Sequence, residues 1–150
     1  MKLLIPGGAG YIGSHMVQYA QEHGHEVVVL DDFSTGQEWA ISNCEVLRVN
    51  LLDQDRLAKE LAGLEFDGVI HFAAKSLVGE SVLKPELYYR NNVVGTLNLV
   101  KEMLKNGMKN LVFSSTAAIF GDPKTTKLAE DHPEKPINPY GKSKHMVEDM

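Results

Sequence analysis

The residues best suited to acid–base chemistry lie near the end of the 150-residue chain, in the segment Asn138-Pro-Tyr-Gly-Lys-Ser-Lys144. Asn138 is a suitable helix N-cap and Pro139 is favoured at the first helical position, so a helix is predicted to start here. Tyr140 and Lys144 then lie one turn apart on the same helix face. Because an ammonium held near a phenol favours the phenolate form, the pair can act as general base and general acid.

Three hydroxyl side chains follow an apolar run further upstream, namely Ser114, Ser115 and Thr116. A hydroxyl from Thr116 or Ser115 could share the substrate oxygen with the phenol and stabilise the charge that develops on it. For Ser114 the favoured interpretation is the cap of a following turn. A Tyr-x-x-x-Lys pair is common on surface helices, so its catalytic interpretation depends on the rest of the chain.

A second chemical segment, Lys2 to His15, is a short apolar run that breaks into glycines. Gly8, Gly10 and Gly13 have the G-x-G-x-x-G spacing, while Gly7, Gly10 and Gly13 have the G-x-x-G-x-x-G spacing. Such glycines permit a sharp turn, close approach to a pyrophosphate and close packing of helix on strand. The helix N-terminus then faces the phosphates. An ordinary tight turn is the alternative, but the flanking strand and helix favour dinucleotide binding.

Two carboxylates end the next apolar run. Asp31 lies 18 residues after Gly13, close to the spacing of the acid that accepts hydrogen bonds from the adenosine ribose. A 2′-phosphate would meet both Asp31 and Asp32, and no Lys or Arg between Asp31 and Leu47 neutralises it. The sequence therefore predicts NAD rather than NADP as the cofactor. A solvated turn residue is the alternative interpretation of Asp31.

Alternating strands and helices must position these groups. Strands are predicted at about residues 2–6, 26–31, 45–49, 68–73 and 110–114. Helices are predicted at about residues 11–23, 53–62, 86–106 and from 139, with a short helix or turn near Trp39. The order predicts an α/β fold with a doubly wound parallel sheet, whose ligands bind at the carboxyl ends of the strands.

The hydrophobic pattern also predicts helix faces and ends. The expected inward faces are Ile12, Met16 and Ala20, then Leu57, Ala58 and Leu61, then Val93, Leu97, Val100 and Leu104. Asp53 is an expected N-cap, and Gly24 and Gly107 are expected to end helices. Four of the six prolines lie between Gly121 and the final helix, which predicts a long irregular loop there.

Composition limits the function classes. A 150-residue chain with 43% hydrophobic and 23% charged residues suits one soluble domain, residues 1–150. A net charge of −5 without a basic run argues against nucleic acid or an anionic membrane as the main partner. Cys44 cannot form an internal disulfide, and no stretch reaches the ~20 apolar residues of a membrane span. With no signal-peptide pattern, a cytoplasmic location is expected.

Six segments together resemble the extended short-chain dehydrogenase/reductase family, and within it the nucleotide-sugar epimerases. They are Gly7–His15, His71–Ala74, Val78–Ser81, Tyr88–Val93, Phe113–Thr116 and Tyr140–Lys144. The resemblance implies a Rossmann-type fold, bound NAD and a UDP-sugar substrate, with interconversion of UDP-glucose and UDP-galactose. Hydride would leave C4 of the sugar while Tyr140 takes the O4 proton, and would return to the other face of a 4-keto intermediate.

The resemblance also implies roles by position. Thr116 would be the hydroxyl partner, with Ser115 beside it, and Lys144 would tune Tyr140 and hold the nicotinamide ribose. The cofactor would lie against Gly7, Gly10, Tyr11, Ile12, Gly13, Asp31, Asp32, Phe33, Ser34, Asn50, Leu51, Phe72, Ala73, Ala74, Ser76, Asn91, Ser114, Tyr140 and Lys144. No metal site is implied.

The chain departs from the family pattern at several positions. Pro6 removes an N–H just before the glycine loop, Asn50 replaces an Asp usually near the adenine, and Ser76 replaces a Lys. Family members continue well beyond the position of Met150, so we expect a fold truncated before the substrate domain. The open sheet edge that results predicts a homodimer or higher association.

Two functional classes remain open. The chain is either the cofactor-binding half of an epimerase or a stand-alone NAD-binding or assembly module without turnover. A nucleotide-sugar dehydratase is a weaker alternative, because Ala117 and Ala118 follow Thr116 where that resemblance calls for acidic residues.

Overall fold

The computed structural model describes residues 1–123, 125 and 127–150, which divide into two compact units. The first, here called the sheet unit, comprises residues 1–73 and 97–114. The second, here called the helical unit, comprises residues 74–96 and 115–150. Within the described residues no helix is long and apolar enough to span a bilayer. That the chain is one domain stays a prediction.

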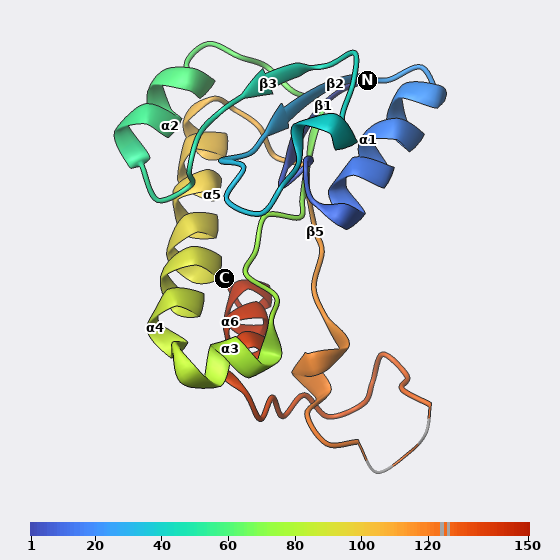
Figure 1. The fold of residues 1–150 in the computed structure, drawn as a ribbon, viewed down its shortest axis with the longest axis vertical. Helices are drawn as coiled ribbons and strands as arrows, with labels where there is room; N and C mark the ends of the chain where they lie inside the picture. Colours follow the sequence, from blue (N-terminus) through green and yellow to red (C-terminus); the bar gives the residue numbers. More distant parts are fainter. Residues whose placement is uncertain (124, 126) are drawn as a thin grey trace. The chain divides into compact units, whose positions relative to one another are not determined.

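The sheet unit contains a parallel sheet of five strands in the order β3-β2-β1-β4-β5 (Figure 1). The strands are β1 (Lys2–Pro6), β2 (Glu26–Leu30), β3 (Glu45–Leu47), β4 (Gly68–His71) and β5 (Leu111–Phe113). Its helices are α1 (Tyr11–Glu22), the 3-10 turn η1 (Glu38–Ala40), α2 (Gln54–Leu61) and most of α5 (Gly95–Lys105). The predicted Rossmann-type α/β fold is therefore confirmed, with strands slightly shorter than expected.

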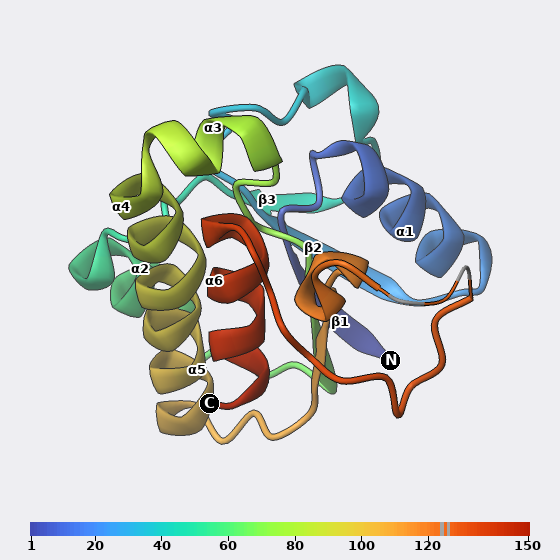
Figure 2. The ribbon, with the colours of Figure 1, turned by 90° about the horizontal axis from the view of Figure 1, so that it is seen from below.

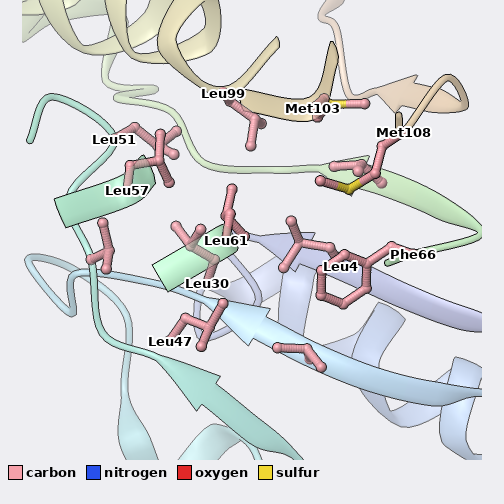
Figure 3. Close-up of a cluster of buried hydrophobic side chains, with 13 residues drawn as sticks. Leu4, Leu30, Leu47, Leu51, Leu57, Leu61, Phe66, Leu99, Met103 and Met108 are labelled. Carbon is pink, nitrogen blue, oxygen red and sulfur yellow. The ribbon is translucent and has the colours of Figure 1, made fainter. Parts of the chain in front are cut away.

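Alternate side chains of the strands build two hydrophobic clusters on the two faces of the sheet. One cluster joins α1 to the sheet through Leu3, Ile5, Val17, Ala20, Val27 and Val29. The other joins α2 and α5 to the sheet and includes Leu4, Val28, Leu30, Leu57, Leu61, Leu99, Met103 and Met108 (Figure 3). Helices on both faces make the sheet doubly wound, so its carboxyl edge is where this fold places ligands.

The helical unit consists of short helices around α6. Its elements are α3 (Val78–Leu83), α4 (Pro85–Tyr88), the π-helix η2 (Tyr89–Val94), the 3-10 turn η3 (Ala117–Phe120) and α6 (Pro139–Glu148). Helix α6 packs against α3, α4, η2 and η3 (Figure 2). Between η3 and α6 no helix or strand lies within the described part, which confirms the predicted irregular loop.

Several local predictions are confirmed. The Asp53 carboxylate accepts a hydrogen bond from the Arg56 N–H at 3.2 Å and caps α2. Asn138 Oδ1 accepts from the Gly141 N–H at 2.8 Å and caps α6. Gly24 and Gly107 follow α1 and α5 with φ of +76° and +74°, as expected of glycines that end helices.

The predicted inward face of α1 is confirmed at Ala20 and wrong at Ile12. Ile12 is 62% exposed and Met16 is partly buried, and the helix buries Gly13, Ser14, Val17 and Ala20. A Cβ added at Gly13 would lie 2.1 Å from the Gly7 carbonyl oxygen. This close approach turns Gly13, and the residues one and two turns after it, toward the sheet, so small residues rather than Ile12 form the buried face.

The predicted helix over residues 86–106 is also wrong in detail. The structure has α4, η2 and α5 in succession, preceded by α3, which the sequence pattern missed. Leu97 and Leu104 are 49% and 68% exposed, whereas Thr96, Leu99 and Met103 are buried. Asn92 and Thr96 are buried with hydrogen bonds, and a hydrophobic pattern does not count such polar residues as inward-facing.

Candidate functional site

At two positions of the glycine loop in the sheet unit, a side chain would strike backbone atoms at less than 3.0 Å. Gly7 has φ +80°, and an added Cβ would lie 2.4 Å from the Ala73 N atom. At Gly13 the Cβ would strike the Gly7 carbonyl oxygen. Gly10 is the N-cap of α1, which has no side-chain cap and no acidic residue in its first turn. The positive end of the α1 dipole is therefore left to an external anion.

Asp31 is buried at the end of β2 and braces the glycine loop. Its Oδ2 accepts from the Ala9 N–H at 3.0 Å, and its Oδ1 accepts from the Phe33 N–H at 2.9 Å. A carboxylate has about four lone-pair sites, so these two bonds leave acceptor capacity for a ligand hydroxyl. The ribose-binding role of Asp31 stays a prediction, and the structure adds a loop-bracing role.

Asp32 is bonded to the loop that follows β3. Its Oδ1 accepts from the Ser34 N–H at 2.9 Å, and its Oδ2 accepts from Asn50 Nδ2 at 2.6 Å. Asn50 Oδ1 in turn accepts from the Leu52 N–H at 2.8 Å. The amide of Asn50, which the resemblance places near the adenine, thus donates to Asp32.

A cation, Arg48, follows β3 and contacts two residues of the loop that follows β2. Arg48 lies one residue beyond the stretch from Asp31 to Leu47, and its guanidinium lies 4.1 Å from the centroid of the Phe33 ring. It also forms an ion pair with Glu38. The parallel register pairs Leu30 with Leu47, so Arg48 follows β3 beside the carboxylates that follow β2. A longer search window would have found it.

The predicted acid–base pair lies on α6 in the helical unit, where Tyr140 and Lys144 are one turn apart. Lys144 is 3% exposed. This burial lowers the pKa of its ammonium from 10.5 to about 8, against the raising effect of the Glu148 carboxylate. The Tyr140 ring packs edge-on against Tyr88, with the ring centroids 6.4 Å apart.

The hydroxyls that follow β5 divide into different environments. Thr116 Oγ1 accepts from the Ala118 N–H at 3.2 Å and caps η3, so Thr116 and not Ser114 caps the turn. Ser115 Oγ is buried and has no hydrogen-bond partner among the described residues. A Cβ added at Gly141 would lie 2.5 Å from the Ala118 carbonyl oxygen. The turn that carries Thr116 therefore packs tightly against the start of the Tyr140 helix.

Asn92, which the sequence argument missed, joins three parts of the helical unit. Its Oδ1 accepts from the Lys75 N–H at 2.8 Å, and its Nδ2 donates to the Lys75 carbonyl at 3.0 Å. The same Nδ2 donates to Ser143 Oγ at 2.9 Å, and that hydroxyl donates to the Tyr140 carbonyl at 2.7 Å. Asn92 lies in the π-helix η2, a conformation often found at functional sites.

The predicted site residues are divided between the two units. In the sheet unit lie Gly7, Gly10, Tyr11, Ile12, Gly13, Asp31, Asp32, Phe33, Ser34, Asn50, Leu51, Phe72, Ala73 and Ser114. In the helical unit lie Ala74, Ser76, Asn91, Ser115, Thr116, Tyr140 and Lys144. The dinucleotide loop and its carboxylates thus belong to one unit, and the acid–base pair with its hydroxyls belongs to the other.

Comparison with known proteins identifies the relatives of this arrangement. The model of the NAD dependent epimerase/dehydratase family matches residues 3–150. The UDP-glucose 4-epimerase of Streptomyces lividans is 49% identical over 99% of this chain and 46% of its own length. That of Halalkalibacterium halodurans is 46% identical over 100% of this chain and 45% of its own length.

Solved structures with a similar fold are also 4-epimerases. The UDP-Glc/GlcNAc 4-epimerase of Campylobacter jejuni superposes with a TM-score of 0.94 at 42% identity, over 99% of this chain and 47% of that one. The UDP-glucose 4-epimerase of Brucella ovis, crystallised in complex with NAD, superposes with a TM-score of 0.95 at 40% identity. The match covers 99% of this chain and 46% of that one. The chain therefore spans about half the length of the relatives that it matches.

Proposed function

The chain belongs to the NAD dependent epimerase/dehydratase family, and from this membership we propose that it is the NAD-binding, acid–base half of a UDP-glucose 4-epimerase. The proposed reaction interconverts UDP-glucose and UDP-galactose through a 4-keto intermediate. The observation that carries the proposal is the burial of Lys144 one turn from Tyr140 on α6. A buried lysine with a pKa of about 8 is unfavourable for stability and typical of a catalytic site.

The residues of the sheet unit fit the dinucleotide. A Cβ at Gly7 would strike the Ala73 backbone and a Cβ at Gly13 would strike the Gly7 carbonyl, so the glycines keep the loop tight, and the N-terminus of α1 without a side-chain cap suits the pyrophosphate. Asp31 retains acceptor capacity for the ribose hydroxyls. When bound, the nicotinamide supplies a hydride acceptor for C4 of the sugar and a hydride donor for the return step.

The residues of the helical unit would handle the proton. Tyr140 would take the proton of the sugar O4 as hydride leaves C4, and would give it back when hydride returns to the other face. The Lys144 ammonium would favour the phenolate form of Tyr140 electrostatically. Thr116, on the turn packed against the start of α6, or Ser115 with its unbonded Oγ, would donate to the same sugar oxygen.

Catalysis needs the rest of the substrate site, so the test joins this chain at Met150 to the remaining half of the Streptomyces lividans relative. We expect the joined protein to convert UDP-galactose to UDP-glucose. The matched variant Tyr140→Phe keeps the ring and its packing on Tyr88 but removes the ionisable group. We expect it to bind NAD and to lose epimerisation by about a hundredfold or more.

Two outcomes would contradict the proposal. Near-normal epimerisation by Tyr140→Phe would show that Tyr140 is not the base. A joined protein that folds and binds NAD but converts no UDP-sugar would favour the alternative function, a module that binds the dinucleotide without turnover. Strand β5 has no neighbour beyond β4 among the described residues, which supports the further proposal that the isolated chain associates as a homodimer or higher species.

A further inference from the structure

Two loops at the carboxyl edge of the sheet are tied together by one short hydrogen bond. The Nδ2 of Asn50, after β3, donates to Oδ2 of Asp32, after β2, at 2.6 Å. Each partner also folds its own turn, because Asp32 Oδ1 accepts from the Ser34 N–H and Asn50 Oδ1 accepts from the Leu52 N–H. The short length and the ionised acceptor make this a charge-assisted bond, stronger than a neutral one.

The pair lies where a doubly wound sheet receives the adenosine half of a dinucleotide. Asp31, which precedes Asp32, ends β2 and braces the glycine loop through the Ala9 N–H. Asn50 Oδ1 is occupied by its own turn, and the amide donates to Asp32. The positions of the two loops therefore depend on each other.

We propose that Asp32 and Asn50 form a positioning pair that holds the two loops of the adenosine half-site at the correct separation, Asn50 acting through Asp32. The proposal rests on the proposed NAD-binding function. The pair needs one carboxylate and one amide, but either position can supply either group. Asn50→Asp alone places two carboxylates where the 2.6 Å bond now lies, so they repel each other and separate the loops. The exchange Asp32→Asn with Asn50→Asp restores one acceptor and one donor.

The test titrates NAD calorimetrically into the 150-residue chain and four variants, with the melting temperature of each recorded. We expect Asn50→Asp to weaken NAD binding at neutral pH by about tenfold or more. The double variant Asp32→Asn/Asn50→Asp should recover to within about threefold of the wild type. Asp32→Asn should fall between them, because one of its two acceptor positions becomes a donor.

The control is Asn43→Asp, which adds the same charge to the sheet unit at an exposed residue with φ 54° that aspartate tolerates. It should leave NAD affinity unchanged. If each substitution only damaged the structure, the double variant would bind NAD at least as weakly as either single variant. Recovery of its NAD affinity therefore indicates the interaction between the two residues. If Asn50→Asp does not fold, the double variant still decides the matter, because it must fold and bind NAD.

An Asn50→Asp variant that binds NAD as well as the wild type would overturn the proposal. So would a double variant that is folded but binds as weakly as Asn50→Asp. A wild-type chain that does not bind NAD at all would overturn the proposed function, and this inference with it. The two failures are distinguished by the wild-type titration.

Discussion

The buried Lys144 ammonium opposes folding at neutral pH. The pKa of Lys144 falls from 10.5 to about 8 in the folded chain because burial disfavours the charged form. Between these two pH values the unfolded chain binds a proton that the folded chain does not. The free energy of unfolding therefore rises as the pH increases from about 8 to about 10.5. Below pH 8 the full penalty for burying the Lys144 ammonium opposes folding. A depression of this size corresponds to about 3 kcal/mol.

Replacing Lys144 by Met should consequently stabilise the chain. We expect the free energy of unfolding at pH 7 to rise by about 2 kcal/mol, and the increase in stability above pH 8 to disappear. Urea unfolding measured from pH 6 to pH 10 checks both. The matched control is Lys142→Met, which removes an exposed lysine from the same helix and should change neither quantity. If the free energy of unfolding of Lys144→Met depended on pH as it does in the wild type, the burial penalty would not belong to Lys144.

Single residues were predictable from the sequence where their partners lie close in the chain. Asp53 and Asn138 cap helices through N–H groups three residues later, and Tyr140 and Lys144 share one helix. Residues with distant partners were missed. The partners of Asn92 include Ser143, 51 residues away. Arg48 meets Phe33 only because β2 and β3 pair in parallel.

At the scale of elements, the contact between α1 and the glycine loop is the most restrictive. Gly13→Ala would place a Cβ 2.1 Å from the Gly7 carbonyl oxygen, and this atom is backbone and cannot turn aside. We expect a loss of about 3 kcal/mol or more in the free energy of unfolding, together with weaker NAD binding, because α1 must move off the loop.

The matched substitution is Gly79→Ala in α3, where an added Cβ meets nothing within 4 Å. It should be neutral or stabilise the chain by up to about 1 kcal/mol, since alanine is the better helix former. Urea unfolding of both variants provides the comparison. Equal effects of the two substitutions would mean that helix propensity, and not the close approach at Gly13, governs the result.

The order of the elements was predictable, but the rotation of the helices was not. Short apolar runs alternating with helical patterns located all five strands. The pattern then chose the most apolar stripe of each helix as its inner face. In α1 the close approach of Gly13 decides the rotation, and in the helices from Pro85 onward buried polar bonds of Asn92 and Thr96 decide it. Both depend on tertiary contacts, which periodicity does not contain.

For the whole molecule, the two edge strands of the sheet, β3 and β5, each lack a neighbour on one side among the described residues. Strand β5 pairs only with β4 among the described residues, and Val112 is 62% exposed. Exposed apolar edge strands promote association. We expect the mass measured by light scattering to rise with the concentration of the 150-residue chain, and Val112→Lys to reduce the rise. A wild-type chain that stays monomeric over the whole concentration range would contradict this prediction.

The relatives explain why the whole molecule was harder to predict than its parts. The chain spans about half of each relative, so the substrate and the acid–base roles stay proposals. Local motifs identified the family because all six segments lie within these residues. The substrate and the state of association depend on contacts that this stretch does not define alone.

We expect this chain to bind NAD, and a calorimetric titration of the 150-residue chain with NAD and with NADP measures this binding. We predict one NAD bound per chain, with NADP bound at least about tenfold more weakly. The physical reason is that a 2′-phosphate would meet the carboxylates of Asp31 and Asp32 while Glu38 already pairs with Arg48. No detectable NAD binding, or NADP binding as tight as NAD, would contradict the account.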